Sequence, residues 1–212
     1  LGAVVPLERG PDTDEFFLTF EVLGSHSNVR TEPVPLTPAP PPDVPRPPDI
    51  GLRVFDEINA TMAEVTGVSP MAPEVLRTFQ TVRQQLPTVE NIEGFLAAHQ
   101  VAIAQLSIEY CNALVDDTGL RASYFPGVDF SAPAGTAFAT QVQRNLVLDP
   151  LLARVMGQNL ASQPDPADVR TELGSLMTRL SACGTSCPAE RTPTIVKSVC
   201  AALLGSAVMA VQ

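Results

Sequence analysis

The chain has 212 residues, enough for one good core or two small domains, and carries 13 basic against 23 acidic residues, a net charge of −10. An acidic chain without a basic cluster lacks the surface that binds nucleic acid or anionic lipid. With no tryptophan and only two tyrosines, it also lacks platforms for base stacking. We therefore expect no nucleic-acid partner.

The first residues of the sequence lack the pattern of an export signal. It begins with Leu1, and no basic segment followed by an apolar run comes after it. A secretory signal would show both features. We therefore expect a processed product or a fragment from which any export signal has already been removed.

Residues 15–23 have the pattern of a single β-strand. Apolar side chains occupy every second position, namely Phe16, Leu18, Phe20 and Val22. Gly24 and Ser25 end the run, and no convincing partner strand follows. A lone strand leaves its backbone unpaired, so we predict that a protein partner or neighbouring subunit supplies the sheet through residues 15–23.

A proline-rich segment follows this strand. Residues 33–48 contain nine prolines. Proline fixes φ and removes a backbone donor, so the segment is predicted to be a semi-rigid polyproline II spacer. The alternative is a ligand for a proline-reading domain. We therefore divide the chain into a strand segment (residues 1–30), a linker (residues 31–49) and a helical domain (residues 50–212).

One long helix over residues 89–116 is predicted to organise the helical domain. Apolar positions recur along it at alternating steps of four and three, the period of a face buried along its whole length. That face consists of Ile92, Leu96, His99, Ile103, Leu106, Tyr110 and Ala113. The next face carries Ile108, Cys111, Leu114 and Val115. Two buried sides indicate the central helix of a bundle.

Shorter helices are predicted on both sides of this helix. An apolar stripe precedes it at Phe55, Ile58, Met62 and Val65. Gly67 is expected to end that first helix, and the next one is expected to open at Pro73. Residues 117–133 are predicted to form a loop, and a weaker helix is predicted over residues 134–147.

Later helix starts combine a capping residue with proline at the first helical position. The pattern occurs at Asp149-Pro150, Asp165-Pro166 and Thr192-Pro193. In all, we predict six or seven helices and no strand pair after residue 50. The predicted fold class is mainly α, a multi-helix bundle preceded by a lone β-strand segment and a Pro-rich linker.

The apolar run over residues 195–211 could be mistaken for a membrane span. It is seventeen residues long with a single charge. That is short for a hydrocarbon core of about 30 Å, and the run is rich in Ala, Gly and Ser and has no cationic flank. We therefore predict a buried bundle helix and no membrane span.

The four cysteines indicate disulfides and an oxidising compartment, because their number is even and two of them bracket a tight turn. The alternatives are buried thiols in a cytosolic protein, and zinc, for which the second half of a paired-ligand pattern is missing. The turn can bring Cys183 close to Cys187, and Cys111 and Cys200 lie in mid-helix on apolar sides. We predict these two pairs and an extracytoplasmic location: secreted, cell surface or periplasmic.

No residue is predicted to be catalytic or to bind a cofactor or a metal. His99 lies on the apolar stripe, far in sequence from His26, so it is more readily a hydrogen-bonded core residue than a catalyst or a metal ligand. Asp12, Asp14 and Glu15 suit either calcium or a solvated acidic turn. A glycosylation sequon starts at Asn59 but lies inside a predicted helix.

Three stretches together carry a family resemblance. They are Glu21-Val22-Leu23-Gly24-Ser25-His26-Ser27-Asn28-Val29, Phe55-Asp56-Glu57-Ile58-Asn59-Ala60-Thr61-Met62, and Ile92-Glu93-Gly94-Phe95-Leu96 with Glu109-Tyr110-Cys111-Asn112-Ala113-Leu114. They resemble the C-terminal region of large secreted or surface proteins of Gram-negative bacteria with laminin-G-like, concanavalin-like sandwich domains. The resemblance implies a sandwich upstream, to which residues 15–23 would belong or be donated, and it transfers no functional residue.

The expected function is a non-enzymatic, extracytoplasmic interaction or assembly module. In it, a disulfide-supported helical domain is tethered to a β-rich partner. The alternative is an accessory subunit of an extracytoplasmic enzyme or electron-transfer complex. A third hypothesis, an enzyme that uses the loop over residues 116–130, is disfavoured by the shortage of convergent titratable groups.

Overall fold

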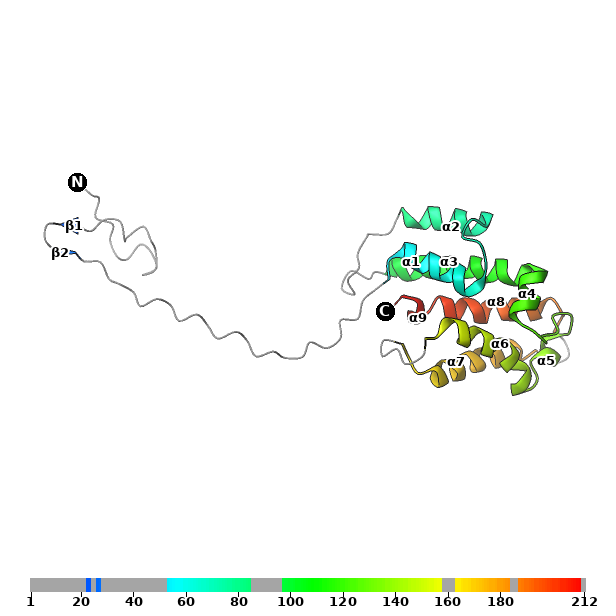
Figure 1. Ribbon diagram of the computed structural model, residues 1–212. Helices are drawn as coiled ribbons and strands as arrows, with labels where there is room; N and C mark the ends of the chain where they lie inside the picture. Colours follow the sequence, from blue (N-terminus) through cyan, green and yellow to red (C-terminus); the bar gives the residue numbers. More distant parts are fainter. Residues whose placement is uncertain are drawn as a thin grey trace. The chain divides into compact units, whose positions relative to one another are not determined.

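The computed structural model describes residues 22–23, 26–27, 53–84, 97–157, 163–183 and 187–210. The chain divides into two compact units, Leu1–Pro47 and Pro48–Gln212. In the first unit the described elements are two short strands, β1 (Val22–Leu23) and β2 (His26–Ser27) (Figure 1). The rest of the predicted strand and the predicted linker lie outside the described residues.

The two strands pair antiparallel, with Val22 opposite Ser27. The prediction that the strand over residues 15–23 has no partner within the chain is therefore wrong for its last two residues. Glycine followed by a second loop residue is typical of a two-residue hairpin connection, and Gly24-Ser25 stands between the two strands in the sequence. Outside the described residues lie Phe16, Leu18 and Phe20.

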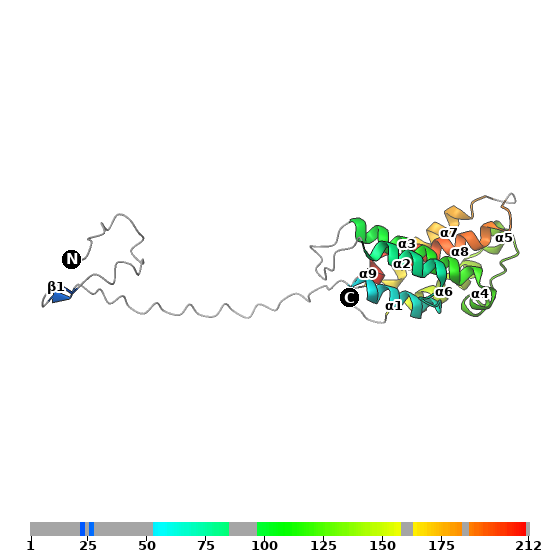
Figure 2. The same ribbon diagram turned by 90° about the horizontal axis from the view of Figure 1, so that it is seen from above.

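The described part of the second unit is helical, which confirms the mainly α class (Figures 1 and 2). In chain order its helices are α1 (Phe55–Thr66), α2 (Pro73–Arg83), α3 (Ala97–Asp116), α4 (Thr118–Tyr124), α5 (Ala134–Ala137), α6 (Gln141–Val155), α7 (Pro166–Leu180), α8 (Arg191–Leu204) and α9 (Ala207–Ala210). Among the described residues, no helix combines the length and the apolar character needed to span a membrane.

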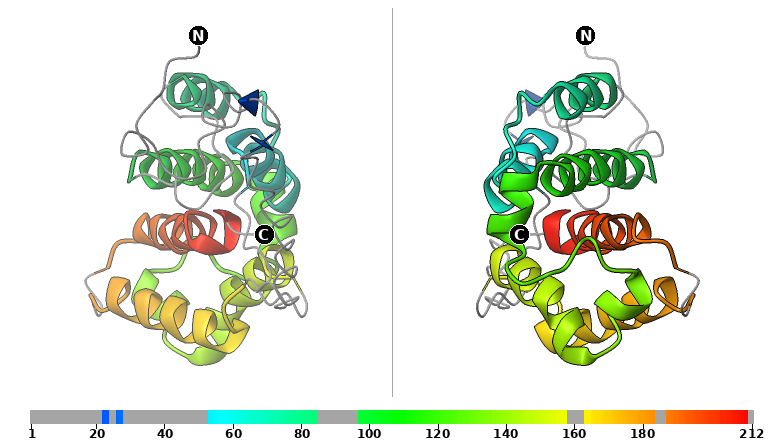
Figure 3. Two further views of the ribbon diagram at one scale, coloured as in Figure 1. Left: turned by 90° about the vertical axis from the view of Figure 1, so that its left-hand side faces the viewer. Right: turned by 90° about the vertical axis from the view of Figure 1, so that its right-hand side faces the viewer.

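The helices stack in layers around the pair α3 and α8 (Figure 3). On one side, α1 and α2 pack against α3. On the other side, α6 and α7 pack against α8. Buried side chains from α1 to α9 form one continuous hydrophobic cluster, so the layers share a single core.

The buried face of α3 follows the predicted period over its described length. Ile103, Leu106 and Tyr110 are buried, as predicted. Ile108 was predicted to be buried but is 47% exposed. Around the helix axis, the buried side of α3 extends as far as Val115. At about 100° per residue, Ile108 lies just beyond Val115 around the axis, outside this buried side. Residues 89–96 of the predicted helix lie outside the described residues.

Several predicted helix ends are confirmed. Gly67 ends α1 in the left-handed region, with φ 73°, and its N–H donates to the Ala63 carbonyl. Pro73 is the first residue of α2. Asp165 caps α7, because its side chain accepts the N–H of Ala167. Gly67 and Asp165 thus pair backbone groups at the helix ends, whereas Pro73 has no N–H to leave unpaired.

The predicted loop over residues 117–133 contains α4, so that prediction is wrong in its first part. The Asp117 carboxylate accepts the N–H groups of Gly119 and Leu120, each at 2.8 Å. An aspartate that follows one helix can also start the next, and here the two bonds of Asp117 stabilise a new helix immediately after α3.

The predicted helix start at Asp149-Pro150 is wrong, because Pro150 lies inside α6. The helix begins at Gln141, where Thr140 and Gln143 form a capping box. This also divides the weaker helix predicted over residues 134–147 into α5 and α6. Proline removes one backbone hydrogen bond, and packing of the buried residues near it keeps the helix continuous.

The start predicted at Thr192-Pro193 is displaced by two positions, because the cap is Glu190 and not Thr192. Helix α8 begins at Arg191, and the buried Thr192 hydroxyl donates to the Ala132 carbonyl at 2.7 Å instead of capping the helix. The same bond ties the start of α8 to the segment before α5. A side chain predicted to act locally thus makes a long-range contact.

Polar contacts hold α3 and α8 in antiparallel register. Gln100 Nε2 donates to the Gly205 carbonyl at 2.6 Å, and Lys197 Nζ pairs with the Asp116 carboxylate at 2.7 Å near the other end. Between them, the buried Ser107 hydroxyl lies 3.2 Å from the Ala201 carbonyl. The helices approach so closely that a Cβ on Gly205, at the end of α8, would stand 3.1 Å from Ser107 Oγ and 3.6 Å from Ala104 Cα of α3.

We expect Gly205→Ala to lower the free energy of unfolding by about 1–3 kcal/mol, because the new methyl group would clash with the Ala201 carbonyl of its own helix, at 2.9 Å, and with Ser107 Oγ of α3, at 3.1 Å. The control is Gly174→Ala in α7, whose Cβ would meet only Leu148 Cδ1 at 3.9 Å. It should raise stability by about 0.5–1 kcal/mol through helix propensity. Urea unfolding measures both variants, and effects of the same sign would contradict the steric conflict at Gly205.

Candidate functional site

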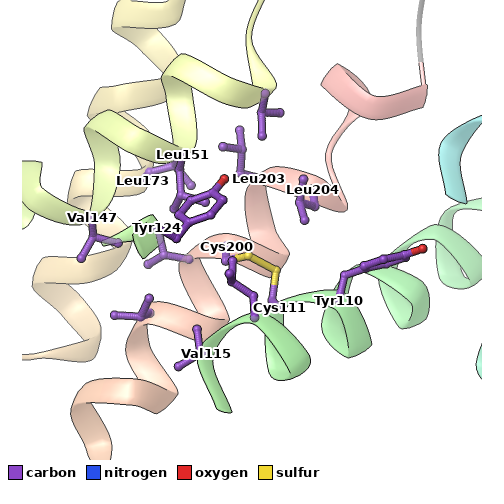
Figure 4. Close-up of a cluster of buried hydrophobic side chains, with 14 of the residues drawn as sticks. Tyr110, Cys111, Val115, Tyr124, Val147, Leu151, Leu173, Cys200, Leu203 and Leu204 are labelled. Carbon is purple, nitrogen blue, oxygen red and sulfur yellow. A yellow bond between two sulfur atoms is a disulfide. The ribbon is translucent and has the colours of Figure 1, made fainter. Parts of the chain in front are cut away.

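The centre of the helical unit carries a disulfide. Cys111 of α3 is bonded to Cys200 of α8, with a Cα–Cα distance of 5.9 Å, and both side chains are fully buried. Figure 4 shows the bond between the two helices, within the cluster that includes Val115 and Leu204. The pair is the one that the sequence predicts. It links positions 89 apart in sequence, and so fixes the helix pair on which the other helices pack.

A second disulfide joins Cys183 and Cys187, also as the sequence predicts, with a Cα–Cα distance of 5.3 Å. It lies between the end of α7 and the start of α8. Cys187 is buried, whereas Cys183 is half-buried at the surface. This bond closes a short connection, so it constrains a turn and not the arrangement of distant helices.

A cleft of about 880 Å³ lies between the end of α6 and the start of α7. Its polar groups already have partners. Asp149 forms an ion pair with Arg170 across the two helices, Gln163 accepts the N–H of Gly157 at 2.8 Å, and Asp165 caps α7. These side chains bind one another or the backbone and so join the two helices. They therefore stabilise the contact between α6 and α7, and do not converge on a common point as the residues of a catalytic centre do.

A smaller groove, of about 330 Å³, lies between α2 and α3. It is lined by Arg77, Thr78, Thr81, Val82, Gln105, Ile108 and Glu109. Arg77 is paired with Glu74 on its own helix. Ile108 and Val82 contribute the apolar part of this surface, and these lining residues form no cluster of convergent titratable groups.

Two buried tyrosines differ in their hydrogen bonding. Burial raises the pKa of Tyr110 to about 12, and its hydroxyl donates to Asn59 Oδ1 at 2.7 Å. Burial also raises the pKa of Tyr124 to about 12. The positive charge of Arg154, whose guanidinium lies 4.1 Å from the ring centre, lowers this pKa but has the smaller effect. Within the described residues the Tyr124 hydroxyl has no hydrogen-bond partner. Both phenols are therefore neutral at physiological pH, and neither is poised as a general base.

Figure 4 shows Tyr124 in apolar surroundings that include Leu151, Leu173 and Leu203. Its contact with Arg154 joins α4 to α6, and sequence analysis missed it. The two residues belong to different helices and follow no local spacing rule. Only the packing of the helices brings them together.

The remaining candidates occupy ordinary structural positions. His99 is half-buried near the start of α3. Asn59 of the sequon is half-buried and holds the Tyr110 hydroxyl, which is a packing role. In the region of the third hypothesis, hydrogen bonds from Ser131 hold the pKa of Asp129 below its usual value.

Metal binding was not predicted, and the described residues contain no group of three or more side chains suited to hold a metal ion. Asp12, Asp14 and Glu15, which suit either calcium or a solvated acidic turn, lie outside the described part of the chain. No family model, curated protein or solved structure matches this chain. The resemblance to laminin-G-like surface proteins therefore stays a prediction.

The two tyrosines allow a matched test of these contacts. Tyr110→Phe removes the bond to Asn59 and should lower the free energy of unfolding by about 1 kcal/mol. Tyr124→Phe removes a buried hydroxyl that lacks a partner in the described residues, and should leave stability unchanged or raise it by up to about 1 kcal/mol. Urea unfolding at neutral pH compares them. A larger loss for Tyr124→Phe would reveal a partner for its hydroxyl.

Proposed function

We propose that the chain is a non-enzymatic, extracytoplasmic interaction or assembly module, a disulfide-supported helical domain tethered to a β-rich protein partner. The observation that carries the proposal is the buried Cys111–Cys200 bond. Structural disulfides persist in oxidising compartments and are rare in the cytosol. Because this bond joins the two central helices, it belongs to the core of the fold. That supports a secreted, cell-surface or periplasmic location.

The partners of the polar side chains support an interaction role over a catalytic one. In the cleft between α6 and α7, Asp149 and Arg170 neutralise each other. Around α4, Asp117 caps the helix and Asp129 accepts bonds from Ser131. These groups stabilise local structure, whereas in a catalytic site several polar groups converge on one reacting atom.

The sequence of residues 15–23 supports a β-rich partner. Its apolar alternation extends well before the two residues that pair in β1. A two-residue hairpin buries little, so the apolar positions Phe16, Leu18 and Phe20 suit addition to a larger sheet. A sandwich of the laminin-G-like type is the partner that the resemblance implies.

The disulfides give the first test. Replacing Cys111 and Cys200 by alanine should lower the free energy of unfolding by about 4–5 kcal/mol, because that bond closes the longer loop. Replacing Cys183 and Cys187 should lower it by only about 2 kcal/mol in the same chain-entropy account. Guanidinium unfolding of the oxidised protein measures both. Four free thiols in protein from its native compartment would overturn the proposed location.

The partner strand gives the second test. In the isolated chain, amides of residues 15–21 should exchange with solvent rapidly, because the proposed sheet belongs to another protein. Native-state hydrogen exchange resolved by peptide mass spectrometry measures this, with the buried part of α3 as the protected reference. Strong protection of residues 15–21 without a partner would contradict the proposal. Copurification with a redox-cofactor protein would favour an accessory subunit instead.

A further inference from the structure

A groove of about 350 Å³ runs between α7 and the region where α8 ends and α9 begins. Its lining is mostly apolar: Val169 and Leu173 contribute from α7, and Leu203 and Val208 from the opposite wall. That wall also carries the small side chains of Ala202, Ser206 and Ala207. Since these side chains are short, the two walls leave a space that larger residues would fill.

Two carboxylates stand on the rim of this groove. Asp168 and Glu172 lie four residues apart on α7, are exposed, and form no ion pair with any described residue. Like charges at this spacing repel each other, so a cation placed between them is favoured. By contrast, Asp149 and Asp116 are already paired with Arg170 and Lys197. The groove therefore combines an apolar floor with unneutralised negative charge.

We propose that this groove binds a helical segment of a partner protein that presents a leucine-sized side chain beside arginine or lysine. The aliphatic side chain would lie between Leu173 and Leu203, and the basic side chains would lie against Asp168 and Glu172. An amphipathic helix in an apolar groove is a common mode of recognition, and complementary charge at its rim sets orientation and specificity.

Two features favour a helix as the occupant. The walls are themselves helices, so a third helix can pack along them, and the small residues on the α8–α9 wall allow close approach of its backbone. The two carboxylates share the four-residue spacing that places two arginines on one face of a helix. The contact is additional to the proposed strand pairing, so either can fail while the other stands.

The test uses the full chain and a synthetic probe. The probe is an alanine-based peptide of about 18 residues, a length sufficient for it to form a helix. It carries two leucines spaced four residues apart on one face of the helix, and two arginines with the same spacing on the adjoining face. Two control peptides replace both arginines by glutamate or both leucines by alanine. Titration by NMR at low salt gives the affinity and locates the perturbed methyl groups. We expect the shifts to centre on Leu173, Leu203 and Val208.

The protein variant Asp168→Asn with Glu172→Gln should weaken binding of the arginine peptide about five- to tenfold. The matched variant Glu64→Gln with Glu190→Gln removes two exposed carboxylates outside the groove, so it changes the net charge equally and should leave the affinity within about twofold. Both control peptides should bind at least about tenfold more weakly than the probe.

Three results would overturn the proposal. They are no binding of the arginine peptide at millimolar concentration, methyl shifts centred away from the groove, and equal weakening by the two double variants. The last result would mean that only net charge attracts the peptide. All the substituted carboxylates are exposed, so loss of folding is not expected, and circular dichroism of each variant checks this.

Discussion

The antiparallel contact between α3 and α8 determines the arrangement of the helical unit. It is fixed at several points: Gln100 against Gly205, Ser107 against Ala201, and the ion pair of Asp116 with Lys197. The disulfide lies between the last two. On α3 these points span about 24 Å at 1.5 Å per residue. Contacts at both ends and in the middle fix the register and the rotation of the two helices together, which a single contact cannot do.

The other helices depend on this pair because most of them are too short to be stable alone. Helices of fewer than about 12–15 residues are marginal in water and take most of their stability from packing. Here α1 and α2 bury their apolar sides against α3, while α5, α6 and α7 pack on α8. A change that separates the central pair would therefore expose both layers, and the Cys111–Cys200 bond opposes that separation.

Local chemistry made much of the fold predictable, and long-range packing accounts for what was missed. Gly67 and Asp165 act within a few residues of themselves, so their sequence context suffices to place two helix ends. Pro150 was misread because the capping box at Thr140 starts the same helix earlier. The exposure of Ile108 depends on how far the neighbouring layers reach around α3. The apolar sides of Cys111 and Cys200 indicated their pairing, whereas no sequence signal joins Tyr124 to Arg154.

The unequal burial of the two disulfides gives them different chemical lifetimes. Exchange requires a thiolate to reach a sulfur atom, and in the folded protein no such approach is open to Cys111 or Cys200. Their bond can be exchanged only when the core opens, so its rate of reduction reports global unfolding. Cys183 is half-buried at the surface, and a reductant can reach its bond while the fold is intact. The rate at which the Cys111–Cys200 bond is reduced therefore depends on the stability of the core. The rate at which the Cys183–Cys187 bond is reduced depends on the thiols in the surrounding solution.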